Sequence, residues 1–90
     1  MKQYTDQLIK DPKWIMQRIV KEHINQIKKW GIQTHSPFEW LTYTTEELGS
    51  LAKAISEYEY RNGTIDHIID EAFQVATLAI KIAEMYKKEN

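Results

Sequence analysis

Apolar residues recur at three- and four-residue steps over most of the chain, in three stretches separated by two short interruptions. That spacing is typical of amphipathic α-helices. The interruptions, residues 31–37 and 61–64, contain the glycine, proline and asparagine residues that break helical periodicity. No stretch of useful length alternates apolar and polar residues as a β-strand does. The pattern therefore predicts an all-α fold of three helices.

The first helix is expected to begin at Asp11, because Pro12 then occupies the first helical position, where proline is favoured. Gly31 is expected to end this helix in a left-handed conformation. The residues before Asp11 are expected to form either a short extra helical turn, which would be a fourth helical element, or a loose tail. The apolar stripe of this helix consists of Trp14, Ile15, Ile19, Ile24, Ile27 and Trp30.

The second helix has a clear start signal in Ser36, Pro37 and Glu39, which together are typical of a capping box with proline in the first turn. No strong helix breaker follows until residues 62–63, so this helix is expected to continue to that point. Gly49 lies inside it and is tolerable, because an internal glycine costs only about 1 kcal/mol relative to alanine.

The third helix is expected to run from near Thr64 to about Lys88. Asp66 lies in its first turn, where negative charge is favoured. Isoleucines and alanines give this helix a broad apolar face. A helix that is apolar around so much of its circumference is expected to be buried on more than one side, which suggests a partner subunit.

The 90-residue length allows one domain, residues 1–90, whose core is thin because small domains bury a small share of their surface. Such a chain often completes its core by forming an oligomer. The 12 basic and 13 acidic residues argue against binding to a nucleic acid polymer. The sequence has no cysteine, no apolar signal-peptide core and no apolar run that could span a bilayer. We therefore expect a cytoplasmic protein that does not associate with membranes.

Two glutamates, Glu47 and Glu71, each begin an otherwise apolar helical stripe, because the residues four, seven and eleven positions later are all apolar or aromatic. If the second and third helices pack antiparallel, both carboxylates lie near the core, where an unpaired charge is costly. Facing glutamates on neighbouring helices can form a divalent-metal site, and Mg²⁺ prefers oxygen ligands. The alternative is that each glutamate reaches solvent or pairs with a cation such as Lys53 or Arg61.

Around these glutamates the sequence resembles the MazG-like, all-α nucleoside triphosphate pyrophosphohydrolase family. The family motif is Glu-Glu-x-x-Glu on one helix and Glu-x-x-Asp on the next. The corresponding segments here are residues 46–50, Glu-Glu-Leu-Gly-Ser, and residues 70–74, Asp-Glu-Ala-Phe-Gln. Residues 30–37, Trp-Gly-Ile-Gln-Thr-His-Ser-Pro, are also similar to the family. The resemblance covers roughly residues 14–86 and implies a MazG-like helical bundle.

The resemblance implies a metal site made by Glu47, Ser50, Glu71 and Gln74, with Mg²⁺ or Mn²⁺ as the cofactor. Ser50 stands where the family has its third glutamate, and Gln74 stands where the family has its aspartate. Some relatives also carry glutamine at the last position. Two carboxylates therefore replace four, and we expect weaker binding of magnesium.

The activity implied by the resemblance is hydrolysis of a nucleoside triphosphate to the monophosphate and pyrophosphate by a dimer or tetramer. The expected catalytic residues are Glu46, Glu47 and Glu71. Glu47 and Glu71 bind the metal, and Glu46 is expected to orient the attacking water. Asp70 is an alternative for that role. The residues expected to contact the nucleotide are His35, Trp40 and Lys53.

Two other interpretations remain open from the sequence. In the first, the fold binds nucleotides or another protein but has weak catalysis or none. In the second, the chain is a helical interaction domain whose likeness to the family is coincidental. For Trp40 the alternative is packing in a core or a subunit interface, and for Lys53 it is a solvated side chain.

Overall fold

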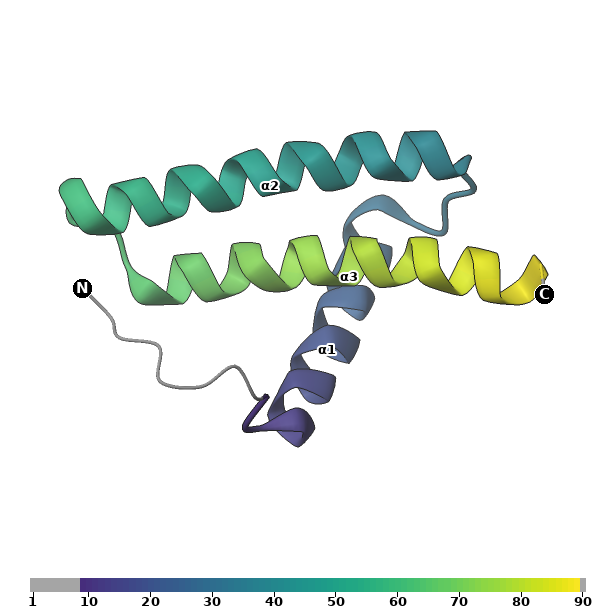
Figure 1. Ribbon diagram of the computed structural model, residues 1–90, viewed down its shortest axis with the longest axis horizontal. Helices are drawn as coiled ribbons and strands as arrows, with labels where there is room; N and C mark the ends of the chain where they lie inside the picture. Colours follow the sequence, from purple (N-terminus) through teal and green to yellow (C-terminus); the bar gives the residue numbers. More distant parts are fainter. Residues whose placement is uncertain (1–8, 90) are drawn as a thin grey trace.

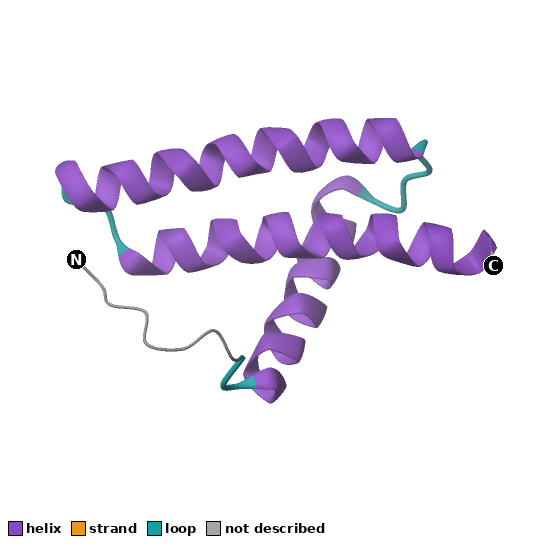
Figure 2. Ribbon diagram, viewed as in Figure 1, coloured by secondary structure: helices purple, strands orange, loops and turns teal. Residues whose placement is uncertain are grey.

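The computed structural model describes residues 9–89 of the chain, and these form an all-helical structure without strands. Figure 2 shows three helices joined by short loops. Their bounds are α1, Pro12–Trp30; α2, Pro37–Tyr60; and α3, Ile65–Glu89. The three predicted helices are confirmed to within about two residues at each end. A short extra helical turn or a loose tail was expected before Asp11. Residues 9–11 are not helical, and residues 1–8 lie outside the described part of the chain.

The helices begin and end where the sequence supplies caps. The Asp11 side chain accepts a hydrogen bond from the Trp14 amide at 3.1 Å. The Gly31 amide closes α1 by donating to the Ile27 carbonyl at 2.7 Å, and Gly31 has a φ of 75°. At the start of α3, the Thr64 hydroxyl accepts from the third amide of the new helix at 3.1 Å. Each cap satisfies a backbone group that has no partner within the helix.

The α2 and α3 helices form an antiparallel hairpin, and α1 passes behind α3 at a steep angle (Figure 1). Among the described helices, α1 packs against α3 and not against α2. Trp14 of α1 meets the Phe73 ring edge-on, with ring centroids 5.3 Å apart. One turn later, the Arg18 guanidinium lies over the same ring and bonds the Asp70 carboxylate at 2.7 Å. These contacts fix the side of α3 that faces α1.

The core lies between α2 and α3, and it is thin. Within the described residues, the buried apolar side chains are Ala54 of α2 and Leu78 of α3. Both belong to the stripes that Glu47 and Glu71 begin, so the predicted apolar seam of the hairpin is confirmed. Many large apolar side chains of all three helices stay exposed. None of the helices in residues 9–89 combines the length and the apolarity needed to cross a membrane.

Candidate functional site

Glu47 of α2 and Glu71 of α3 meet across the seam of the hairpin. The Glu71 side chain is 13% exposed, and its Oε2 atom is buried without a hydrogen-bond partner. Burial raises the pKa of Glu47, and the adjacent Glu71 carboxyl, placed within hydrogen-bonding reach, raises it further. Two carboxyl groups form a hydrogen bond with each other only when one of them is protonated. When both are ionised they repel each other, and a nearby cation relieves that repulsion.

Glu22 of α1 brings a third carboxyl to this region. Burial is the main cause that raises the pKa of Glu22, and the charge of Asp70 is the second. The Arg18 guanidinium lowers the pKa of Glu22, whereas Glu71 raises it again. The charge of Glu22 in turn raises the pKa of Glu47. The site thus draws acids from all three helices, although the sequence predicted acids from α2 and α3 alone.

A signal for Glu22 is present in the sequence of α1. Arg18, Glu22, Gln26 and Lys29 follow one another at steps of four, four and three residues, which places them on one helical face. Two of them contact α3 directly, because Arg18 bonds Asp70 and Gln26 accepts from Lys81 at 2.6 Å. A polar line of this kind on an amphipathic helix indicates a face that meets other polar groups rather than solvent alone.

The predicted metal ligands divide into two groups. Glu47 and Glu71 come together, whereas the exposed Ser50 hydroxyl donates to the carbonyl of Glu46 in its own helix at 3.4 Å. Gln74 is half-buried and lines the pocket between α1 and α3 described next. Within residues 9–89, no three histidine, cysteine, aspartate or glutamate side chains lie close enough together to hold a metal ion.

A polar pocket of about 320 Å³ lies between α1 and α3, beside the acid pair. Glu22 and Asp70 contribute carboxylates to its wall, and the cationic side chains are Arg18, Lys21 and Lys29. The charge of Lys29 lowers the pKa of both Glu22 and Glu47, so the pocket and the acid pair are electrostatically connected. Cations next to acids suit a ligand that carries both phosphates and a divalent cation.

Two predicted site residues, Glu46 and Lys53, lie outside this pocket. Both are exposed. The Lys53 side chain is 78% exposed, and its ammonium lies 4.0 Å from the Glu57 carboxylate one turn further along α2. In this conformation neither side chain lines the pocket between α1 and α3.

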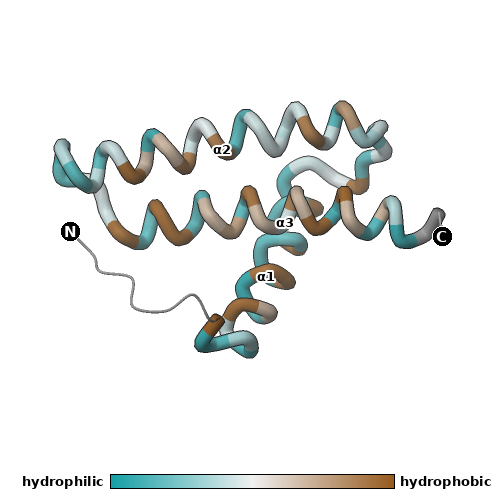
Figure 3. The backbone as a smooth tube through the Cα atoms, in the orientation of Figure 1, coloured by the Kyte–Doolittle hydropathy of each residue, from teal (hydrophilic) through white to brown (hydrophobic). Residues whose placement is uncertain are grey.

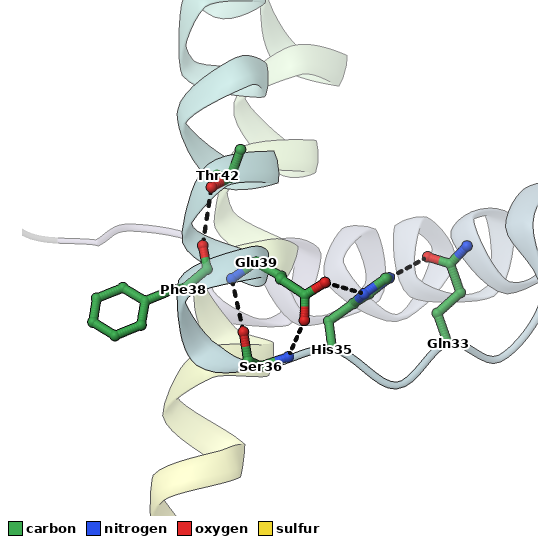
Figure 4. A network of polar contacts seen from close by, with 6 residues as sticks. All are labelled: Gln33, His35, Ser36, Phe38, Glu39 and Thr42. Atoms are coloured by element: carbon green, nitrogen blue, oxygen red, sulfur yellow. Dashed lines mark hydrogen bonds and ion pairs between the residues drawn. The ribbon is translucent and has the colours of Figure 1, made fainter.

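His35 and Trp40 meet at the start of α2, together with Tyr43. The His35 ring lies 4.9 Å from the Trp40 ring and 5.1 Å from the Tyr43 ring, edge-on in both cases. Figure 4 shows His35 between Gln33, which it contacts at 3.1 Å, and Glu39, at 3.6 Å. Hydrogen bonds from the backbone and hydroxyl of the N-cap serine lower the pKa of Glu39. The His35 ring is thus held by the capping box of α2.

A more apolar groove of about 650 Å³ continues from the polar pocket, and Gln26 and Trp30 line both. Trp40 forms part of its wall, and the Lys81 ammonium lies 5.3 Å from the Trp40 ring centroid. Burial lowers the pKa of Lys81. Two groove residues, Gln26 and Thr77, keep buried polar atoms without hydrogen-bond partners. This groove has the size and the aromatic wall that a planar ring system requires.

No protein-family model, curated protein or solved structure matches the chain. A pair of facing glutamates, a third carboxyl and a cation-lined pocket lie next to an aromatic groove. Acidic, cationic and aromatic side chains from all three helices thus lie next to one another.

Proposed function

We propose that this chain is a Mg²⁺-dependent nucleoside triphosphate pyrophosphohydrolase, in keeping with its resemblance to the MazG-like family. The observation that carries the proposal is the contact between Glu47 and Glu71 beside a pocket lined by three cationic side chains. Half-buried acids in mutual contact are costly in a small domain unless a cation neutralises them. Phosphoryl chemistry requires this combination of metal ligands and cations, and it needs no covalent nucleophile.

The residues present fit magnesium. The unpartnered Oε2 of Glu71 and the raised pKa of Glu47 mark a place where positive charge is missing. Mg²⁺ keeps several waters and is commonly bound by one or two carboxylates together with substrate phosphates. A pair of glutamates is therefore enough, whereas a cage made wholly of protein ligands is not required. When bound, the ion would neutralise phosphate charge and lower the pKa of a coordinated water.

The other residues receive roles from their positions. Lys29, Lys21 and Arg18 are proposed to bind the phosphates, since they line the polar pocket. Glu22 is proposed to accept the proton of the attacking water, because its raised pKa brings it nearer to neutral pH. Glu22 fits this role better than the exposed Glu46.

The base is proposed to lie in the groove beside Trp40, where aromatic stacking contributes about 1–3 kcal/mol per base. His35 then positions Trp40 through their edge-on contact. Lys53 would reach phosphate only by leaving Glu57. We further propose that the protein acts in the cytoplasm as a homo-oligomer, either a dimer or a tetramer.

A second candidate function is nucleotide binding with weak catalysis or none. It is favoured by the neutral Ser50 and Gln74 and by the exposed position of the Ser50 hydroxyl. Two fewer negative charges weaken the hold on magnesium, whereas they do not weaken the attraction of the lysines for phosphate. Such a protein would bind nucleotide without turning it over.

The test is a panel of ribo- and deoxyribonucleoside triphosphates incubated with the full chain and Mg²⁺ or Mn²⁺, with release of pyrophosphate as the readout. The proposal predicts metal-dependent pyrophosphate from at least one nucleotide and its loss in Glu71→Gln. Glu59→Gln, an exposed acid on α2, is the matched control and should retain activity. Absence of turnover at high protein and metal concentration would eliminate the hydrolase. Calorimetric nucleotide binding would then support the second candidate.

A further inference from the structure

Lys81 of α3 lies in the apolar groove beside Trp40, and its direct partners there are neutral. Its ammonium donates to the Oε1 atom of Gln26 at 2.6 Å and lies 5.3 Å from the centroid of the Trp40 ring. The side chain is half-buried, and burial lowers its pKa, although the charge of Glu22 opposes that effect. Lys81 lines the groove but not the polar pocket. A desolvated cation with neutral partners favours a ligand that brings an electron-rich acceptor.

The Gln26 amide is held in one orientation by the same contact. An ammonium can only donate, so the amide turns its oxygen to Lys81 and leaves its Nε2 group for other partners. Gln26 is 4% exposed, and its Nε2 atom is buried without a hydrogen-bond partner. Gln26 lines the polar pocket as well as the groove, so it lies where the two meet. Nε2 is therefore a second donor, unused, next to the Lys81 ammonium.

The Thr77 hydroxyl is a further polar group of the groove that lacks a partner. Three threonines of α2 donate to the carbonyl four residues earlier in their helix. The Thr77 side chain lies inside α3 and is 2% exposed, yet its Oγ1 atom has no such partner. An unpaired buried hydroxyl costs free energy, and each such group in a native structure requires an explanation. A polar atom of a ligand in the groove supplies one.

The surface around these donors is largely aromatic and aliphatic. Trp30 and Trp40 line the groove, together with aliphatic side chains of α1 and α3. Figure 3 shows apolar positions of both helices near their crossing. Glu84 also lines the groove, but it is exposed and lies almost one turn beyond Lys81. The ligand that fits is planar and presents acceptors on the edge that meets Lys81 and Gln26.

Two neighbouring donors distinguish among the purine bases. Guanine presents two acceptors side by side, the O6 oxygen and the N7 nitrogen, and hypoxanthine has the same pair. Adenine presents N7 beside an amino group that donates. In the same position, that amino group faces donors that are already desolvated, and both sides then lack an acceptor. A base with an oxygen at C6 satisfies the two donors, whereas a base with an amino group there does not.

We infer that the groove selects nucleotides whose base is a 6-oxopurine, guanine or hypoxanthine, with the Lys81 ammonium and the Gln26 amide donating to O6 and N7. The inference rests on the proposed function and adds to it the class of base. The Nε2 atom of Gln26 has almost no accessible surface, so the amide rotates slightly about its contact with Lys81 when the base binds. The polar pocket and the groove are continuous at Gln26, so one nucleotide can occupy both.

Binding of matched nucleotide pairs tests the inference. One pair is inosine and adenosine triphosphate, and the other is guanosine triphosphate and its 2,6-diaminopurine counterpart. The members of each pair differ at C6, which carries an oxygen or an amino group. Their α,β-imido analogues, in which the bond that the proposed reaction breaks is blocked, permit calorimetry with the full chain and Mg²⁺. The 6-oxo member of each pair should bind at least about tenfold more tightly.

The possible results separate the inference from the proposed function. Equal affinity within both pairs would overturn the base selection and leave nucleotide binding in place. Tighter binding of a cytidine or uridine analogue than of both 6-oxopurines would do the same. Absence of binding by every nucleotide would overturn the proposed function and the inference together.

Substitution of Lys81 tests whether this residue sets the preference. Lys81→Met removes the ammonium and keeps most of the stem, so the two members of each pair should bind with nearly equal affinity. Lys87→Met removes an equal charge from an exposed α3 position outside the groove and should retain the preference. General damage to the fold would weaken both members of a pair alike and would leave their ratio unchanged. A wild-type ratio in Lys81→Met would therefore overturn the inference.

An analogue of guanosine triphosphate that lacks N7 tests the second contact. The 7-deaza analogue should bind the wild type more weakly than guanosine triphosphate does. In Lys81→Met this difference should shrink, because one of the two donors is gone. Equal binding of the two analogues by the wild type would contradict donation to N7.

Discussion

Glu47 and Glu71 lie one on each helix of the hairpin, and the Glu71 carboxyl raises the pKa of Glu47 in addition to the effect of burial. The Oε2 atom of Glu71 has no hydrogen-bond partner. The contact lowers the stability of the protein when both groups are charged, and the proposed divalent cation would remove that penalty. Stability and metal binding are thus expected to depend on the same two residues.

The acid pair makes stability depend on pH. Burial and acidic neighbours raise the pKa values of Glu47 and Glu22 above 4.5. A carboxyl with a raised pKa stabilises the fold below its unfolded pKa, and that contribution is lost as pH rises through the folded pKa. Without metal, the melting temperature should therefore fall as pH rises above 4.5 towards neutrality.

Glu47→Gln should reduce this pH dependence and raise the melting temperature at pH 7 by about 2–4 °C, a small effect because solvent screens the half-exposed pair. Glu59→Gln is the control on the same helix. Thermal unfolding in the presence of a chelator measures both variants. A Glu47→Gln protein that is less stable than the wild type at neutral pH would show that the pair does not repel.

Placing the acids of the MazG-like motif at positions 50 and 74 should strengthen the proposed metal site. Ser50→Glu combined with Gln74→Asp adds two negative charges near the acid pair, and magnesium-dependent activity should rise at least about tenfold, the effect of 1.4 kcal/mol. The same variant should be less stable without metal, because more acids then repel one another. Ser56→Glu supplies the charge control for α2. Unchanged activity together with unchanged metal dependence would mean that these positions do not contribute to the site.

The cationic pocket should determine the affinity for nucleotide. Lys29→Met should raise KM by about tenfold with a smaller change in kcat, since a hydrogen bond to a charged group is worth about 1.5–3 kcal/mol. Lys28→Met removes an equal charge from an exposed neighbour outside the pocket. Equal effects of the two substitutions would indicate general charge attraction in place of a specific phosphate contact.

The capping box of α2 should contribute measurably to stability. Ser36 accepts from the Glu39 amide at 3.2 Å, and Glu39 accepts from the Ser36 amide at 2.9 Å. Ser36→Ala should cost about 1 kcal/mol and lower the melting temperature by about 4–8 °C. Ser56→Ala, towards the C-terminal end of the same helix, is the control and should not lower the melting temperature. Equal melting temperatures would show that the box is dispensable.

The sequence predicted the helices well because their ends are locally determined. Asp11, Ser36 and Gly31 act through their own backbone neighbours, so their roles follow from spacing alone. The meeting of Glu47 and Glu71 also followed from sequence, because each begins an apolar stripe and the short connection forces the helices to be antiparallel.

The contribution of α1 could not be predicted in the same way. Its crossing over α3 depends on contacts between distant residues, such as Arg18 with Asp70, and the polar line along α1 does not specify the partners of its residues. The presence of Glu22 beside the acid pair is therefore information from the structure.

Titration with Mn²⁺, followed by the loss of the free-ion electron paramagnetic resonance signal, tests the central claim most directly. The wild type should bind Mn²⁺, more tightly when a non-hydrolysable nucleoside triphosphate is present. The double variant Glu47→Gln, Glu71→Gln should bind at least about tenfold more weakly, the equivalent of 1.4 kcal/mol or more. Equal Mn²⁺ binding by the wild type and the double variant, with and without nucleotide, would contradict the assignment of this acid pair as the metal site.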